Sequence, residues 1–180
     1  MGTKNPRKSQ SKITIDPQVV YCCDSDSLIN LRDAKLLRKL RFLARINTLK
    51  IPKGVYRELH RKTDRLAQTL KKWKDKYPIV IELDYKSLQL LTYLEREYGK
   101  SFSVGGKHYK GFWASSSGRK SVDAQVIALA KTNKWVAVSN DDSIHGACML
   151  EGVICRRWEE VGRILLGPEQ LKLPGFELSK

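Results

Sequence analysis

The chain reads Val19-Val20-Tyr21-Cys22-Cys23 and then Asp24, so that a short apolar run ends directly in an acid. A second run, Trp135-Val136-Ala137-Val138-Ser139-Asn140, ends in the same way at Asp141 and Asp142. Short apolar runs are typical of parallel strands that are buried on both faces. Because the carboxyl ends of parallel strands meet at one edge of a sheet, we expect these acids to meet there.

Extended and helical segments alternate along the rest of the chain. Strands are expected at residues 48–51, 79–83 and 153–156 in addition to the two runs above, and helices at 27–45, 53–62, 63–76, 85–98, 121–132, 143–149 and 158–166. Ser121 is the expected N-cap of the helix at 121–132. Alternation of this kind favours an α/β fold with a mostly parallel central sheet and right-handed crossovers.

Length and composition indicate one domain. A chain of 180 residues is long enough to bury a substantial core. We expect a basic N-terminal arm over residues 1–17, the domain over 18–166 with an insertion at 100–120, and a C-terminal tail over 167–180. No apolar run approaches the length of a membrane span, and the start of the chain has no apolar signal core, so a soluble cytoplasmic protein is expected.

The charge balance points to a polyanionic partner. The chain has 34 Lys and Arg against 19 Asp and Glu, which gives a formal net charge of +15. The stretch from 100 to 120 contains no acid, and its basic residues alternate with Phe102, Tyr109, Phe112 and Trp113. Single-stranded RNA is bound by such mixtures, because bases stack on aromatic rings and phosphates pair with cations. The alternative is that these aromatic side chains pack onto the core. The candidate RNA-binding residues are Lys100, Lys107, Tyr109, Lys110, Trp113, Arg119 and Lys120.

Two further acids, Glu58 and Asp123, lie on helical segments between the two strand ends. Each acid has a simpler interpretation. Asp24 and Asp141 can start turns, Asp123 suits the first turn of a helix, and Glu58 can be an exposed helix residue. A cluster of all four is costly without a cation, since like charges about 4 Å apart repel by roughly 4 kcal/mol at an effective dielectric constant near 20.

Four motifs resemble those of PIN-domain ribonucleases, in the same order. Asp24-Ser25-Asp26-Ser27-Leu28-Ile29 follows a strand, and Ile51-Pro52-Lys53-Gly54-Val55-Tyr56-Arg57-Glu58-Leu59 leads through a proline into a helix. Ser121-Val122-Asp123-Ala124-Gln125-Val126-Ile127-Ala128-Leu129-Ala130 places an acid on the first turn of an alanine-rich helix. Val138-Ser139-Asn140-Asp141 ends a strand. The resemblance covers about residues 18–166. The basic arm and the stretch from 100 to 120 are additions to the small toxin members of that family.

The resemblance implies a PIN-like three-layer α/β/α sandwich and an endoribonuclease that depends on Mg²⁺ or Mn²⁺. It implies Asp24, Glu58, Asp123 and Asp141 as catalytic residues, with Asp24 and Asp123 as direct metal ligands and Glu58 near the attacking water or a second ion. Asp141 or its neighbour Asp142 would complete the metal site, and Asp26 would support it. Many relatives are toxins of toxin–antitoxin pairs, so an antitoxin protein and a second copy of the chain join RNA as expected partners.

Two other functions fit part of the pattern. Asp24 and Asp26 after one strand, with Asp141 and Asp142 after another, resemble haloacid-dehalogenase-like phosphohydrolases, in which Asp24 would be the nucleophile. That interpretation gives no role to Glu58, to Asp123 or to the positive charge. A non-catalytic RNA- or ribosome-binding module with a decayed nuclease fold is the second alternative. Cleavage of RNA, release of phosphate from small esters, or binding alone would distinguish the three.

Overall fold

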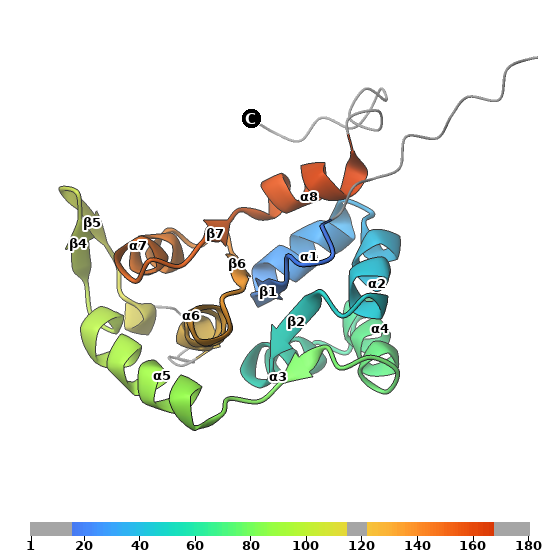
Figure 1. The fold of residues 1–180 in the computed structure, drawn as a ribbon, viewed down its shortest axis with the longest axis horizontal. Coiled ribbons are helices and arrows are strands. Elements are labelled where there is room, and N and C mark those ends of the chain that lie inside the picture. Colours follow the sequence, from blue (N-terminus) through green and yellow to red (C-terminus); the bar gives the residue numbers. More distant parts are fainter. Residues whose placement is uncertain (1–15, 115–121, 168–180) are drawn as a thin grey trace, which may run out of the picture.

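The computed structural model describes residues 16–114 and 122–167. Within these ranges the chain is an α/β protein with a five-stranded, entirely parallel central sheet in the order β3-β2-β1-β6-β7 (Figure 1). The strands of this sheet are β1 (Tyr21–Cys23), β2 (Leu49–Pro52), β3 (Val80–Ile81), β6 (Val136–Val138) and β7 (Cys155–Arg156). β1 is therefore the middle strand, and it pairs with β2 on one side and β6 on the other.

Helices cover both faces of the sheet. α1, α2 and α8 lie on one face, and α6 lies on the other with α5 packed outside it (Figure 1). The described part of the chain has eight α-helices, which are α1 (Ser25–Asp33), α2 (Leu37–Arg45), α3 (Lys53–His60), α4 (Arg65–Lys74), α5 (Tyr85–Tyr98), α6 (Val122–Asn133), α7 (Asp142–Leu150) and α8 (Trp158–Leu166). The expected three-layer α/β/α arrangement with a parallel sheet is confirmed.

The core explains why this topology forms. All three residues of β1 are buried, as are those of β6, because helices cover both faces of the sheet. α6 buries six consecutive or nearly consecutive residues between Ala124 and Ala130, so it packs as an apolar helix between the sheet and α5. One charged side chain, Lys50, is buried in β2, where its Nζ donates to Asn47 Oδ1 at 2.6 Å and to the Pro78 carbonyl at 2.9 Å.

One predicted helix was wrong. Residues 27–45 form two helices rather than one, because Lys35 adopts φ 59° between α1 and α2. The amide of Leu36 then donates to the carbonyl of Leu31, which closes the end of α1. Leucines on both sides of the break still face the core, so their spacing resembles that of one continuous helix. Four of the strands are also shorter than expected, and β2 has the expected length but begins one residue later. Ser121, the predicted N-cap of α6, lies outside the described residues.

The stretch from 100 to 120 contains an antiparallel hairpin of β4 (Phe102–Val104) and β5 (Lys107–Tyr109), followed by the short 3₁₀ helix η1 (Phe112–Ala114). Gly105 and Gly106 form its turn with φ 56° and 79°. The ring of Phe102 packs edge-on against Tyr98 at 5.0 Å between centroids and stacks on Tyr109 at 5.4 Å. The hairpin is therefore attached to α5 through aromatic contacts.

The expected N-terminal arm and C-terminal tail fall largely on residues 1–15 and 168–180, which lie outside the described ranges. None of the helices over the ranges that the structure covers combines the length and the apolar character needed to cross a bilayer.

The base of the hairpin yields a prediction about stability. A Cβ atom at Gly111 would lie 2.0 Å from the backbone carbonyl oxygen of Lys100, and backbone atoms cannot move aside as a flexible side chain can. We expect Gly111→Ala to lower the free energy of unfolding by about 1–3 kcal/mol, as other overpacked sites do. Thermal unfolding would measure the change, with Ser101→Ala on the neighbouring exposed position as the control. Equal stability of the two variants would contradict the close packing at this position.

Candidate functional site

Asp24 follows β1 and caps α1. Its Oδ1 accepts the amide hydrogen of Ser27 at 2.7 Å, and its own amide donates to the carbonyl of Val138 in β6 at 3.0 Å. The side chain is only 5% exposed, and burial raises the pKa of this carboxyl. Hydrogen bonds from Ser139 and Ser27 act in the opposite direction and favour the ionised form. Asp24 is therefore a buried acid whose position is set by β1, which it follows, and by β6, to which its amide is bonded.

Asp141 follows β6 and caps α7 in the same way. Its Oδ1 accepts the amide hydrogens of Ser143 at 2.6 Å and Ile144 at 3.1 Å. The amide of Asp141 donates to Oγ of Ser139 at 3.0 Å. Since the buried Ser139 hydroxyl also hydrogen-bonds Asp24, this serine connects the two acids at the strand ends.

Glu58 lies in the last turn of α3, and a hydrogen bond from α1 holds it. Oγ of Ser25 donates to Glu58 Oε2 at 3.1 Å. α3 is in turn held close to α6, because the amide of Gly54 donates to Gln125 Oε1 at 3.1 Å. A Cβ atom at position 54 would lie 2.6 Å from that oxygen, so glycine allows the close approach of the two helices.

Asp123 lies in the first turn of α6, among the other acids. Burial raises the pKa of its carboxyl, and four neighbouring carboxylates raise it as well, those of Asp141, Asp24, Glu58 and Asp26. Together they bring the pKa from the ordinary 3.8 to about 7. Mutual repulsion of this kind requires the acids to face one another across a short distance. The structure therefore brings the four acids singled out in the sequence to one edge of the sheet, with Asp26, an exposed residue of α1, beside them.

Asp142 has a different environment from Asp141. Its Oδ1 accepts from Nη2 of Arg157 at 2.7 Å and its Oδ2 from Nζ of Lys107 at 3.2 Å. These two cations hold the pKa of Asp142 below its ordinary value. Of the two neighbouring acids, Asp141 raises the pKa of Asp123 and so belongs to the cluster. Asp142 instead connects α7 to the hairpin and to the start of α8.

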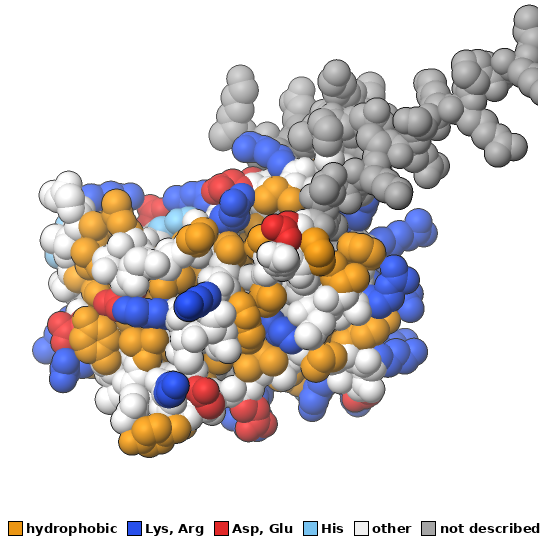
Figure 2. All heavy atoms as spheres, viewed as in Figure 1, with side chains coloured by type: hydrophobic (Ala, Val, Ile, Leu, Met, Phe, Trp, Pro, Cys, Tyr) orange, Lys and Arg blue, Asp and Glu red, His pale blue; other side chains and the backbone are white. Residues whose placement is uncertain are grey.

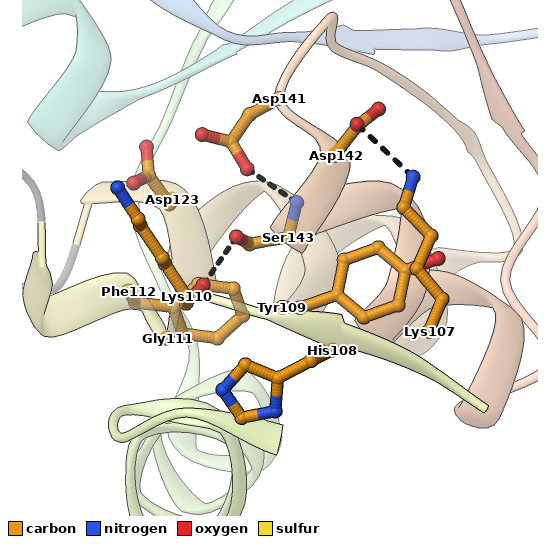
Figure 3. A pocket seen from close by; sticks show the side chains of 10 residues that line it. All are labelled: Lys107, His108, Tyr109, Lys110, Gly111, Phe112, Asp123, Asp141, Asp142 and Ser143. Atoms are coloured by element: carbon orange, nitrogen blue, oxygen red, sulfur yellow. Dashed lines mark hydrogen bonds and ion pairs between the residues drawn. The ribbon is translucent and has the colours of Figure 1, made fainter. Parts of the chain in front are cut away.

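A cavity of about 400 Å³ opens beside the acids (Figure 3). The hairpin and the segment after it form one wall, and Asp123, Asp141 and Asp142 form the other. Lys110 extends across this cavity toward Asp123, while Ser143 Oγ donates to the carbonyl of Lys110 and fixes the backbone there. Two acids of the cluster thus share a cavity with two exposed lysines, Lys107 and Lys110.

The other predicted RNA-binding residues divide into three groups. Tyr109 lines the cavity, but its ring also stacks on Phe102, with Nζ of Lys107 5.0 Å from its centroid. Lys100 is exposed and lies outside this cavity, and Trp113 packs beside Gly99, to whose carbonyl its amide donates at 2.9 Å. Arg119 and Lys120 lie outside the described residues.

The donor set at the sheet edge fits a hard divalent cation. Among the described residues, no three His, Cys, Asp or Glu side chains form a group ready to hold a metal ion as they stand. Mg²⁺ does not require such a cage, because it keeps several waters and binds through one or two carboxylates. Burial and, after it, four neighbouring carboxylates raise the pKa of Asp123, and a bound cation would offset both effects.

Sequence reasoning missed three contributors to the site. Ser139 connects two of the acids, Ser25 holds Glu58, and Arg157 pairs with Asp142. The two serines belong to the quoted motifs, and their position next to the acids was a usable signal. Arg157 had no signal in the sequence, since it reaches Asp142 only when β7 lies beside β6.

Asp123 yields a prediction about pH and stability. Its pKa is higher in the folded than in the unfolded state, so the folded protein holds this proton more tightly. The stability that the bound proton adds is fully present below pH 3.8 and is lost as the pH rises through about 7. We expect Asp123→Asn, tested without metal, to match the native protein near pH 4 and to exceed its melting temperature above pH 7. The gain should be roughly 2–4 °C for each kcal/mol of relieved repulsion.

Differential scanning fluorimetry in the presence of a chelator measures this difference across the pH range. Asp75→Asn, at an exposed position after α4, is the control and should show no such rise. A lower melting temperature for Asp123→Asn at neutral pH would contradict a repulsive cluster.

The comparisons with known proteins concern the fold. No family model and no curated protein matches the sequence. Among solved structures, the crystal structure of PAE2754 from Pyrobaculum aerophilum is similar, with a TM-score of 0.50 and 16% sequence identity. The match covers 83% of this chain and 98% of that one. At this level of identity the likeness extends to the α/β architecture and no further.

Proposed function

We propose that this protein is an endoribonuclease that uses Mg²⁺ or Mn²⁺ to cleave single-stranded RNA. The observation that carries the proposal is the meeting of Asp24, Glu58, Asp123 and Asp141, from four different elements, at the carboxyl edge of a parallel sheet. In open α/β sheets this edge, at the point where the strand order reverses, is where ligands bind. Here the reversal falls between β1 and β6, the strands that end at Asp24 and Asp141.

The charge distribution supports a phosphodiester substrate. The chain as a whole carries +15, yet four of its acids are gathered at one place, and one of them, Asp24, is buried. Lys107 and Lys110 border the same cavity, and Figure 2 shows further Lys and Arg side chains at the edge formed by α2 and α4. An acidic centre for a cation with basic residues around it suits a polyanion whose reacting group is a phosphate.

The side chains divide the work as follows. Asp24, Asp123 and Asp141 would hold the cation, which when bound neutralises charge on the phosphate and lowers the pKa of its water. Glu58, oriented by Ser25, would accept a proton from the attacking water or hold it in line. Lys107 and Lys110 would pair with phosphates on the hairpin side of the cavity. The toxin role, an antitoxin and a second copy of the chain remain predictions of the family resemblance.

The geometry favours this function over the phosphohydrolase. Asp142, one of the four acids of that pattern, is paired with Lys107 and Arg157 instead of joining the others. Glu58 and Asp123 would also have no role in that chemistry. A module that only binds RNA would not require a cluster of acids that repel one another and weaken the fold.

Two neighbouring acids give the sharpest test of the proposed activity. We expect the full chain to cleave single-stranded RNA with Mg²⁺ or Mn²⁺ and to stop when a chelator is added. Asp141→Asn should lower the cleavage rate by roughly 100-fold or more, since several kcal/mol of charge stabilisation depend on the cation. Asn also caps helices, so α7 should remain intact. A gel assay of a labelled oligonucleotide measures the rate.

Asp142→Asn is the matched control, because it removes the same charge one residue away. Its ion pairs are exposed, and pairs of this kind contribute up to about 1 kcal/mol, so its rate should fall by less than about fivefold. Cleavage that does not depend on metal would contradict the proposed activity. A larger loss of rate in Asp142→Asn than in Asp141→Asn would contradict the assignment of Asp141 to the site.

The hairpin provides a prediction that separates binding from folding. Lys110 is exposed, so Lys110→Ala should leave the melting temperature nearly unchanged and reduce the salt dependence of RNA binding by about 0.7 in the log–log slope. Tyr109 stacks on Phe102 and both rings lie against Gly146, so Tyr109→Ala should lower the free energy of unfolding by about 1–3 kcal/mol. Fluorescence anisotropy and thermal unfolding on both variants test this division. The reverse pattern would assign Lys110 to the fold and Tyr109 to the substrate.

A further inference from the structure

A second cavity, of about 350 Å³, lies beside α3 and contains none of the acids of the cluster. It is bordered by α3, by the segment after α4 and by β3, which is the edge strand of the sheet. We call it the basic groove and define it by Lys53, Tyr56, Arg57, Lys74, Tyr77 and Glu82.

Three cations of the groove surround one carboxylate. Nζ of Lys53 donates to Glu82 Oε1, and Arg57 and Lys74 join Lys53 in holding the pKa of Glu82 below its ordinary value. Arg57 and Lys74 are exposed and form no ion pair with any residue in the described ranges. The groove therefore has more positive charge than its single acid neutralises, and Glu82 stands where an external anion would be attracted.

Aromatic faces border the same space. Nζ of Lys74 lies 5.3 Å from the ring centroid of Tyr56, and that ring stacks on His60 at 5.7 Å with an angle of 11° between the planes. Tyr77 provides a second ring on the groove wall. Cations together with aromatic faces suit nucleotides, because the phosphate and the base each find a partner. A purely acidic peptide would use only the cations.

The groove and the acid cluster share one helix. Arg57 faces the groove, and the next residue, Glu58, faces the acids. The order β3-β2-β1-β6-β7 places the groove beside β3 at one end of the sheet, and the hairpin packs on α7, which follows β6 toward the other end (Figure 1). Asp24, after the central β1, lies between them. A single-stranded RNA that runs from the hairpin across the acids would continue toward the groove.

We propose that the basic groove binds a segment of single-stranded RNA that lies beyond the cleaved bond. Arg57 and Lys74 pair with its phosphates, Tyr56 and Tyr77 offer faces to its bases, and Glu82 limits its affinity by competing for Lys53. This inference rests on the proposed ribonuclease activity, and it adds a binding site to the catalytic one.

The test measures binding without cleavage. Fluorescence anisotropy with a labelled oligouridylate of about ten nucleotides, in the presence of a chelator, gives the dissociation constant and its salt dependence. The double variant Arg57→Ala/Lys74→Ala should weaken binding about tenfold and lower the log–log salt slope by about 1.4, which corresponds to two lost phosphate contacts. Glu82→Gln should tighten binding, because it frees Lys53.

The matched control is Lys86→Ala/Arg163→Ala, which removes one exposed Lys and one exposed Arg from α5 and α8. It should weaken binding much less than the groove variant does. Equal losses in the two double variants, or weaker binding by Glu82→Gln, would overturn the proposal. A labelled polyglutamate peptide of the same length that binds as tightly as RNA, through the same residues, would assign the groove to an acidic protein instead.

Cleavage then separates this inference from the proposed function. The groove variant should lose efficiency on the long oligonucleotide through a higher KM and cleave a short one of about three nucleotides as the native protein does. If the native protein cleaves RNA and the groove variant has the same KM and affinity, the groove proposal is refuted and the nuclease proposal stands. Groove-dependent binding without metal-dependent cleavage would refute the nuclease assignment and leave the groove as an RNA site.

Discussion

Repulsion among carboxylates at the carboxyl edge of the sheet is the constraint on which the rest of the structure depends. Asp123 titrates near neutral pH because it is buried among other acids, so the metal-free protein tolerates an unfavourable interaction at its centre. The backbone holds the acids in place against it. The amide of Asp24 is bonded to β6, and both Asp24 and Asp141 cap the helices that follow their strands. Burial of β1, β6 and α6 must therefore outweigh the repulsion, and a cation would relieve it.

Positive charge completes the site on the outside. The hairpin contributes Lys107 and Lys110 on the α7 side, and α3 contributes Lys53 and Arg57 on the β3 side. The hairpin lies outside the central sheet, and α3 follows β2, next to the edge strand β3. The acids, in contrast, come from the ends of the central strands and from the helices packed on them. On α3 the acids and the cations are adjacent, since Arg57 faces the basic groove and Glu58 faces the acid cluster.

The sequence was sufficient to predict the architecture and the meeting of the four acids at one edge of the sheet, since strands that end in acid and amphipathic helices are local patterns. It was not sufficient where tertiary contacts decide. The break at Lys35 was missed because the leucines of α1 and α2 continue a helical spacing across it. Burial of Lys50 depends on Asn47 and Pro78, which approach it only in the folded sheet. The groove was missed for the same reason, because Arg57 and Lys74 read as exposed helix residues.

The difference between Asp141 and Asp142 shows how backbone geometry resolves what the sequence left open. Asp141 is the N-cap of α7 and has extended dihedral angles, φ −71° and ψ 122°, whereas Asp142 is the first residue of the helix. A change of backbone conformation between neighbours turns their side chains in different directions. One acid therefore joins the cluster around Asp123, and the other meets Lys107 and Arg157. Asp142 lies at the start of α7, beside Asp141, and its ion pairs attach the hairpin and the start of α8 to this point. The wall of the cavity and the acid cluster are therefore held in a fixed position relative to each other.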